Sequence, residues 1–215
     1  MTTKTIAITG ATGQFGAIAL DLLKAKQANV LSLVRSPEKI LGVEARKFDY
    51  SKTEGQVEAL QGVDTLILVS SSEVGQRALQ HNNVIESAKK AGVKHIIYTS
   101  LLGATNNNTV KSLAGEHVET EAALKASGIT YTILRNGWYT ENYIASIPAA
   151  LANNAFYGSA KNGKISSVLR AELAEAAVNV ALSEGHENQT YELAGSTSWT
   201  LADLAAEISK QISKQ

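Results

Sequence analysis

Cysteine is absent from this chain of 215 residues. Its absence excludes disulfides, thiolate metal sites, iron–sulfur clusters and a cysteine nucleophile. Proline occurs only twice, and no Pro/Ser-rich stretch separates domains. Twenty basic side chains balance twenty acidic ones, so no strong overall field attracts nucleic acid or an anionic membrane. No apolar run approaches the roughly 18–20 residues of a membrane span, and the chain starts without a signal peptide's hydrophobic stretch. We therefore expect a cytoplasmic protein that binds neither nucleic acid nor membrane.

Short apolar runs, each followed by a stretch of helical periodicity, make up most of the chain. A nearly continuous apolar run is typical of a strand that helices bury on both faces, as in a parallel sheet. Gly62, Gly92 and Gly128 each precede an apolar residue and a new run, which is the pattern of a helix C-terminus. The sequence therefore predicts an α/β fold, a doubly wound parallel sheet of the Rossmann type. The expected strands include Ile6–Thr9, Val30–Val34, Leu66–Val69, Ile96–Thr99 and Tyr131–Leu134.

The last third of the chain has a different pattern. A helix is expected over Glu172–Leu182, a strand over Thr190–Leu193 and a final helix over Leu201–Ile212. Thr200 and Asp203 have the spacing of a capping box at the start of that final helix. We expect residues 1–150 to form a dinucleotide-binding domain and residues 151–215 to pack on it and contribute to a substrate pocket, without being an independent domain.

A glycine-rich loop follows the first expected strand and opens the first helix. It consists of Gly10, Ala11, Thr12, Gly13, Gln14, Phe15 and Gly16. In dinucleotide-binding proteins such glycines allow a tight turn, a close approach to the pyrophosphate and close helix–strand packing. The N–H groups and the positive end of the helix then face the phosphates. The alternative interpretation is a plain turn with chance glycines.

The end of the second expected strand indicates which dinucleotide binds. NAD-specific sites place an acidic residue about 20 positions after the glycines, to bind the ribose 2′-hydroxyl. This chain has Arg35 instead, nineteen positions after Gly16. A guanidinium favours a 2′-phosphate through charge-assisted hydrogen bonds, so we expect NADP(H). The alternative is a solvated surface arginine. Asp49 and Tyr50 are expected near the adenine.

Three further blocks carry a family resemblance: Leu68–Arg77, Tyr98–Leu102 and Leu134–Tyr143. With the glycine loop and Arg35, they resemble the NmrA-like branch of atypical short-chain dehydrogenases/reductases. Within that branch they are similar to the bacterial NADPH:quinone oxidoreductase 2 group, to which triphenylmethane reductase is also similar. The resemblance covers essentially the whole chain.

The resemblance implies an NADPH-dependent, two-electron reductase of quinones. It places Ser70, Ser71 and Ser72 along the nicotinamide-side ribose, and Asn136 and Asn142 beside the nicotinamide and the substrate. The sequence makes only a slight case for a homodimer and leaves open whether one or two chains build the site.

Two departures from related families affect this interpretation. Ordinary short-chain dehydrogenases carry Tyr-x-x-x-Lys on the helix after the fifth strand, where this chain has Leu113 and His117. The missing tyrosine acid disfavours alcohol/ketone chemistry and an epimerase-like reaction, and the quinone-reductase group shares its absence. Members of that group also continue for several dozen residues beyond the last helix, so the C-terminal substrate-binding part is expected to be small and truncated.

The candidate catalytic side chains are His117 and Tyr139. Imidazole titrates near neutral pH, so His117 could protonate a quinone oxygen, or it could be an exposed residue of an amphipathic helix. Trp138, Tyr139 and Tyr143 are expected to supply flat apolar walls for a quinone ring, or to be ordinary packing aromatics. Ser100 is expected at the strand end that lies over the cofactor.

The remaining expectations concern polar residues outside these motifs. No metal site is expected, because His81, His95 and His186 have no ligand-like spacing. Arg170 is expected to pair with Glu172 or Glu175, or else to reach the cofactor. Residues 106–108, three consecutive asparagines, are expected in a polar surface loop. The alternative function is a non-catalytic NADP(H)-binding redox sensor of the NmrA type.

Overall fold

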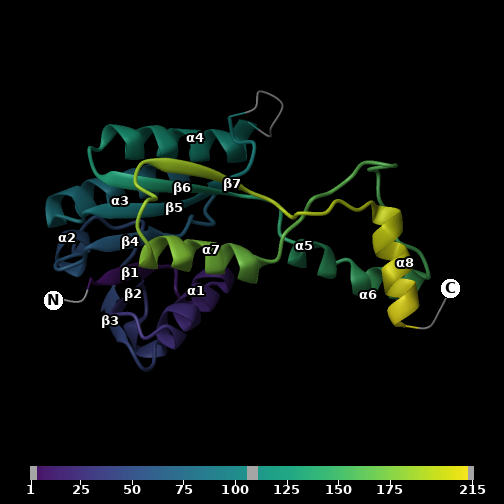
Figure 1. Ribbon diagram of the computed structural model, residues 1–215, viewed down its shortest axis with the longest axis horizontal. Coiled ribbons are helices and arrows are strands. Elements are labelled where there is room, and N and C mark those ends of the chain that lie inside the picture. Colours follow the sequence, from purple (N-terminus) through teal and green to yellow (C-terminus); the bar gives the residue numbers. More distant parts are fainter. Residues whose placement is uncertain (1–3, 106–110, 213–215) are drawn as a thin grey trace.

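Seven parallel strands lie side by side in the order β3-β2-β1-β4-β5-β6-β7 (Figure 1). The computed structural model describes residues 4–105 and 111–212, and the expected asparagine loop over residues 106–108 lies outside them. The expected strands are confirmed. The strands are β1 (Ile6–Thr9), β2 (Val30–Val34), β3 (Glu44–Lys47), β4 (Thr65–Leu68), β5 (His95–Leu101), β6 (Thr130–Asn136) and β7 (Gln189–Leu193).

Helices cover both faces of this sheet, as a doubly wound fold requires. Helices α1 (Gln14–Ala25) and α7 (Arg170–Leu182) cover one face, and α2 (Gln56–Ala59), α3 (Arg77–Ala91) and α4 (Lys111–Ala126) cover the other (Figure 1). Alternate strand residues enter opposite layers, since Ile6 and Ile8 pack towards α1 and α7 whereas Ala7 packs towards the other helices. Burial on both faces explains why the strands are continuous apolar runs.

The joints between helices and strands match the glycine pattern. Gly62, Gly92 and Gly128 have φ values of 77°, 80° and 80°. Gly92 is the C-cap of α3, and its N–H donates to carbonyl groups of the last helical turn. A left-handed C-cap of this kind ends the helix and turns the chain into the next strand.

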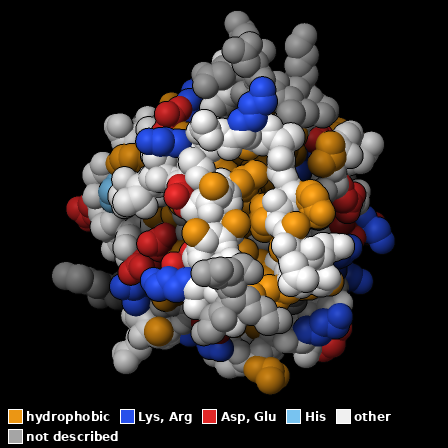
Figure 2. Space-filling view, turned by 90° about the vertical axis from the view of Figure 1, so that its right-hand side faces the viewer, with side chains coloured by type: hydrophobic (Ala, Val, Ile, Leu, Met, Phe, Trp, Pro, Cys, Tyr) orange, Lys and Arg blue, Asp and Glu red, His pale blue; other side chains and the backbone are white. Residues whose placement is uncertain are grey.

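A smaller group of elements follows β6 and forms one end of the molecule (Figure 1). It contains α5 (Glu141–Ile144), α6 (Ile147–Asn153) and the last helix α8 (Leu201–Gln211). A short 3-10 turn, η1 (Pro37–Lys39), follows β2 and is not part of this group. The expected capping box is present, because Thr200 Oγ1 accepts from the N–H of Asp203 at 3.1 Å. Apolar side chains gather on this end (Figure 2), where a groove of about 260 Å³ runs between α6 and α8. No helix among the described residues is long and apolar enough to cross a membrane.

Candidate functional site

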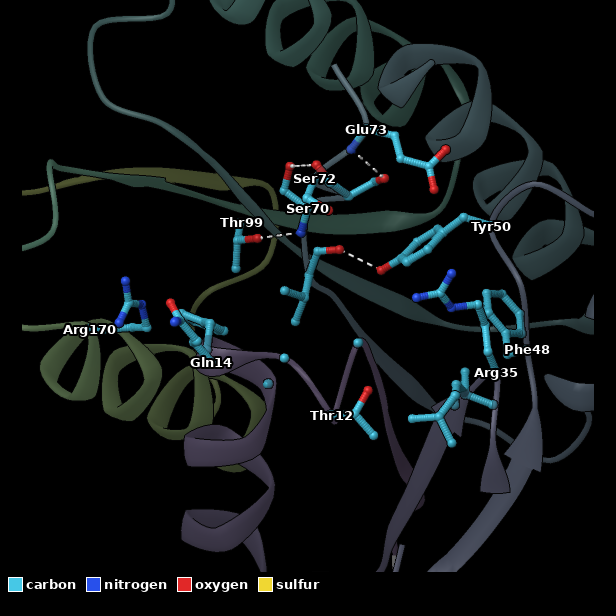
Figure 3. Close-up of a pocket in the computed structure, with 18 of the residues that line it drawn as sticks. Thr12, Gln14, Arg35, Phe48, Tyr50, Ser70, Ser72, Glu73, Thr99 and Arg170 are labelled. Atoms are coloured by element: carbon cyan, nitrogen blue, oxygen red, sulfur yellow. Dashed lines mark hydrogen bonds between the residues drawn. The ribbon is translucent and has the colours of Figure 1, made fainter. Parts of the chain in front are cut away.

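A crevice opens where β1 and β4 end side by side. From these neighbours the chain crosses to β2 on one side and to β5 on the other. Ligands of open α/β sheets bind outside the carboxyl ends of the strands at such a switch point. The first pocket lies there, with a volume of about 560 Å³ (Figure 3). That volume lies in the range of small-molecule and cofactor sites.

The glycine loop forms one wall of the first pocket. Gly10 has a φ of 64°, and the N–H of Gly13 donates to the Gly10 carbonyl at 2.8 Å, which closes a tight turn. A Cβ on Gly16 would lie 2.2 Å from the same carbonyl oxygen, so only glycine allows α1 to start this close to β1. No side chain of the described residues caps the start of α1. This loop and helix end are therefore suited to bind a diphosphate.

The end of the pocket beside β2 contains an arginine that has no ionic partner among the described residues. Arg35 follows β2, is exposed and lines the pocket, as do Phe48 and Tyr50 (Figure 3). Asp49 also lines this pocket. Among the described residues no carboxylate pairs with its guanidinium. The cation is therefore available for a ligand phosphate.

Tyr50 fixes the two strands that border the crevice. Its hydroxyl lies 2.7 Å from Thr9 Oγ1 and also contacts the Val69 carbonyl oxygen. Thr9 in turn accepts from the N–H of Val69 at 3.0 Å. Burial raises the pKa of Tyr50, so the hydroxyl stays protonated. These bonds join the ends of β1 and β4.

A serine-rich loop after β4 forms the opposite wall. The N–H of Ser70 donates to Thr99 Oγ1 at 2.8 Å, and the N–H of Ser71 donates to Nε2 of His81 at 2.9 Å. Ser72 is exposed. Thr99 lies in β5, two residues before the strand ends, and was not predicted as a site residue, although it precedes the predicted Ser100. Because side chains alternate along a strand, the two neighbours point to different faces.

A second pocket of about 260 Å³ adjoins the first. The two pockets share lining residues from β5, the serine loop and the segment after β6. These are Ser70, Ser71, Ser72, Thr99, Tyr139 and Asn142. Trp138 is 53% exposed and lines the second pocket. Burial raises the pKa of Tyr139, and the Asn136 amide and the Arg170 cation offset part of that rise.

Asn136 provides a polar group in the second pocket. The residue is 4% exposed, and no described residue makes a well-aligned hydrogen bond with either atom of its amide. The amide lies near enough to the Tyr139 hydroxyl to lower the pKa of that phenol, but without the geometry of a full hydrogen bond, so it keeps hydrogen-bonding capacity. A ligand that offers both a donor and an acceptor would satisfy it.

His117 is buried beside the second pocket, so its interpretation as an exposed helix residue is wrong. It is 6% exposed, and its Nδ1 lies 2.7 Å from the Tyr98 hydroxyl. Burial lowers the pKa of His117 to about 4, the Arg77 cation adds to that effect, and the Glu121 carboxylate opposes it. The side chain is therefore neutral at neutral pH. Its burial could not be predicted from the amphipathic pattern of α4, because α3 packs against that helix.

The preferred expectation for Arg170 is also wrong. Its guanidinium lies 4.5 Å from the Tyr139 ring centroid and lines the first pocket, and no ion pair links it to Glu172 or Glu175. Glu172 instead accepts from the N–H of Leu169 at 3.1 Å. Glu172 therefore caps the start of α7 and does not pair with Arg170, two positions earlier.

Two other predicted residues, Tyr143 and Ala11, line neither pocket, and a third, Ser100, lines only the second. Tyr143 lines neither pocket and packs edge to face with Trp199, with ring centroids 4.9 Å apart. Ala11 is 2% exposed and belongs to the core. Ser100 lines the second pocket, and its hydroxyl donates to the Glu121 carboxylate at 2.6 Å. The same carboxylate forms an ion pair with Arg135 of β6. The other predicted site residues line the first pocket, the second pocket or both.

Arg77 was missed by the sequence analysis. It is 5% exposed, lines the second pocket, donates to the Ser71 carbonyl at 2.6 Å and pairs with Glu116 at 3.2 Å. Its partners come from the serine loop and from α4. No local sequence signal joins them, because only the packing of α3 against α4 brings the ion pair together.

Comparisons with known proteins agree with this geometry. The sequence matches the NAD(P)H-binding family over residues 10–184. It is 53% identical to quinone oxidoreductase 2 of Escherichia coli over 217 residues, which cover 98% of this chain and 75% of that protein. It is 30% identical to the NmrA-like family domain-containing oxidoreductase flvB of Aspergillus flavus, covering 94% of this chain and 70% of that protein.

Two solved structures are similar over nearly the whole chain. A crystal structure of the E. coli NADPH-dependent quinone oxidoreductase QOR2 with NADPH superposes with a TM-score of 0.92 at 52% identity, covering 98% of this chain and 76% of that one. The triphenylmethane reductase of Citrobacter sp. with NADP(H) also has a TM-score of 0.92, at 37% identity, with coverages of 98% and 77%.

Proposed function

Because the chain belongs to the NAD(P)H-binding family, we propose that it is an NADPH-dependent oxidoreductase that reduces quinones to hydroquinones by two electrons. The observation that carries this proposal is the continuity of the two pockets. The first has the loop, helix end and free guanidinium that suit a phosphorylated dinucleotide. The second pocket is small, adjoins the first, and is lined by aromatic and polar side chains. The similarity to E. coli quinone oxidoreductase 2 supports the same substrate class.

The residues of the first pocket fit NADPH. Gly10, Gly13 and Gly16 would leave room for the diphosphate at the start of α1, and Arg35 would bind the 2′-phosphate. Thr12, Gln14 and Phe15 of the same loop also line this pocket and would bind from the same side. The serine loop would lie along the second ribose, and Asn136 and Asn142 would lie beside the nicotinamide. When bound, NADPH supplies the hydride.

The protein's part in the reaction is to bind, orient and exclude water. A quinone is a good hydride acceptor because its product is aromatic, so the main requirement is alignment. Trp138 and Tyr139 would lie against the quinone ring. Leu113 stands where related enzymes have a tyrosine acid, which supports an acceptor that needs no strong acid. Tyr143 packs on Trp199 in this structure, so its predicted substrate role would require a different position.

Further proposals concern organisation and partners. We propose that residues 1–150 form the cofactor-binding part and that residues 151–215 complete the substrate pocket. Arg170 of α7 in the first pocket and the pairing of β7 with β6 support a segment that is not independent. We also propose a cytoplasmic homodimer without a nucleic-acid partner. The balance of charges supports the absence of a nucleic-acid partner. Light scattering of the purified protein measures its oligomeric state.

The test is a titration of the purified protein with NADPH and NADH, followed by a panel of small quinones. We expect tighter binding of NADPH, and steady NADPH consumption with one hydroquinone formed for each NADPH oxidised. The uncatalysed rate of each quinone with NADPH is the control. Binding of NADPH without any acceleration over that rate would instead identify a redox sensor.

A further inference from the structure

A buried cluster of three rings lies under the second pocket. Tyr98 of β5 and His81 of α3 have no exposed surface, and His117 of α4 is 6% exposed. The Tyr98 ring meets His81 nearly edge to face, with centroids 5.3 Å apart, and its hydroxyl lies 2.7 Å from Nδ1 of His117. His117 alone of the three lines the pocket. The cluster therefore reaches the substrate side through one imidazole.

The protein backbone fixes the proton position on His81. The N–H of Ser71 donates to Nε2 at 2.9 Å, so Nε2 carries no proton. Nδ1 then donates to Thr120 Oγ1 at 3.1 Å, and Thr120 donates to the Glu116 carbonyl at 2.8 Å. Burial also lowers the pKa of His81 to about 3, with smaller effects of His117 and Arg77. His81 is the neutral tautomer with its proton on Nδ1.

His117 is placed for the opposite arrangement. Burial raises the pKa of Tyr98, so the phenol keeps its proton, although the nearby Thr120 and Ser70 hydroxyls offset part of that rise. The phenol oxygen lies 2.7 Å from Nδ1 of His117, and the imidazole tautomer sets which of the two donates in this hydrogen bond. The charged groups that face this imidazole are Arg77 of α3 and Glu121 of its own helix. No described residue bonds its Nε2. When the phenol donates in this hydrogen bond, Nδ1 accepts and the imidazole proton lies on Nε2.

We propose that Tyr98 is a positioning residue that holds His117 as its neutral tautomer, with Nε2–H available to the substrate oxygen in the second pocket. The proposal rests on the quinone reductase function proposed above. It makes His117 a hydrogen-bond donor and not a proton donor. A neutral imidazole can stabilise a developing oxyanion in this way.

The proton balance supports a donor role. Each turnover uses one hydride and one proton to convert a quinone to a hydroquinone, and negative charge grows on the quinone oxygen as the hydride arrives. If His117 gave up its Nε2 proton and took the Tyr98 proton, a buried phenolate would remain, which burial disfavours. The proton that completes the hydroquinone therefore comes from water, while His117 keeps its own.

Histidine tautomers can be measured without any quinone. We expect long-range ¹H–¹⁵N NMR of protein labelled in its histidines to show, at neutral pH, Nε2–H on His117 and Nδ1–H on His81. His117→Gln and His81→Gln assign the signals, and His81 is the internal control for the opposite tautomer. An Nδ1–H or a doubly protonated ring at His117 would overturn the proposal.

Variants then link the tautomer to the reaction. Tyr98→Phe keeps the ring but removes the hydroxyl, so we expect both tautomers at His117 and a kcat about 10-fold lower, with the KM for NADPH unchanged. Tyr131→Phe is the matched control, because Tyr131 lies on the neighbouring strand β6 and lines neither pocket. Unchanged kcat and an unchanged tautomer in Tyr98→Phe would contradict the proposal.

A second pair of variants tests the donor role of His117 even if the Tyr98→Phe protein does not fold. His117→Gln keeps an N–H towards the pocket and His117→Leu does not, so we expect kcat to be about 10-fold higher in the glutamine variant. Equal kcat values in the two variants would count against a donor role. Failure of the proposed function looks different: the unmodified protein would consume no NADPH with any quinone, although its histidine tautomers would still be measurable.

Discussion

Two arginines lie at opposite ends of the first pocket (Figure 3). Arg35 follows β2 at the end expected to bind adenosine, and Arg170 begins α7 and lies over the Tyr139 ring. Arg35 has no ionic partner among the described residues, so binding a phosphate breaks no existing ion pair. A cation in this state contributes to binding without the cost of displacing a carboxylate.

Removal of the Arg35 guanidinium should change cofactor choice. In Arg35→Ala we expect the Kd for NADPH to rise roughly 10- to 100-fold, the effect of losing hydrogen bonds to a charged group worth about 1.5–3 kcal/mol. The Kd for NADH should stay within about twofold, and Arg35→Glu should reverse or abolish the preference. Fluorescence titration measures both constants. Lys26→Ala, the same charge change at the exposed end of α1, is the control, and equal loss of both cofactors in Arg35→Ala would contradict the assignment.

At the scale of elements, the join between β1 and α1 places the helix end in the crevice. Its close approach depends on Gly16, whose added Cβ would lie 2.2 Å from the Gly10 carbonyl oxygen. Gly115 in α4 is a useful contrast, because no atom lies within 4 Å of a Cβ built there. The two glycines thus differ in packing although both lie inside helices.

Substitution of these glycines by alanine should have opposite effects. Gly16→Ala should weaken NADPH binding at least about 10-fold and lower the free energy of unfolding by about 1–3 kcal/mol, since the turn must shift. Gly115→Ala should raise the free energy of unfolding by about 0.5–1 kcal/mol, because alanine is the better helix former. Urea unfolding and NADPH titration measure both variants. A Gly16→Ala protein with unchanged affinity would show that the turn can relax freely.

For the molecule as a whole, buried histidines make stability depend on acidity. Burial is the main cause that lowers the pKa of His81 to about 3 and of His117 to about 4, against an ordinary value of 6.5. Below that ordinary value the unfolded chain binds protons that the folded chain does not. The contribution of both side chains is therefore complete at neutral pH and is lost as the pH falls from about 6.5 towards 4.

Acid unfolding should show this effect directly. Between pH 6.5 and pH 5 each of the two histidines should lower the free energy of unfolding by about 2 kcal/mol, from about 1.4 kcal/mol per pH unit. Urea titrations at several pH values measure the slope. His81→Gln and His117→Gln should each reduce that slope by about 1.4 kcal/mol per pH unit, and an unchanged slope in either variant would mean that the histidine is already charged in the folded protein.

Local sequence determined the strands, the glycine loop and the helix caps. These features could be predicted because they depend on neighbours in the chain: apolar continuity in Ile6–Thr9, the left-handed turn at Gly92, and the capping pair of Thr200 and Asp203. Arg35 was predicted to lie in the cofactor crevice for the same reason, since it directly follows a recognisable strand. The strand ends were underestimated at β5 and β6, where polar residues continue the ladder as far as Asn136.

Tertiary structure decided which side chains face the second pocket and what state they are in. His117 became buried because α3 packs against α4, and Arg77 reached its partner Glu116 by the same contact. Arg170 turned into the first pocket because Glu172 was used to cap its helix. Burial, ion pairing and tautomer depend on groups distant in the chain, so periodicity and spacing carry no record of them.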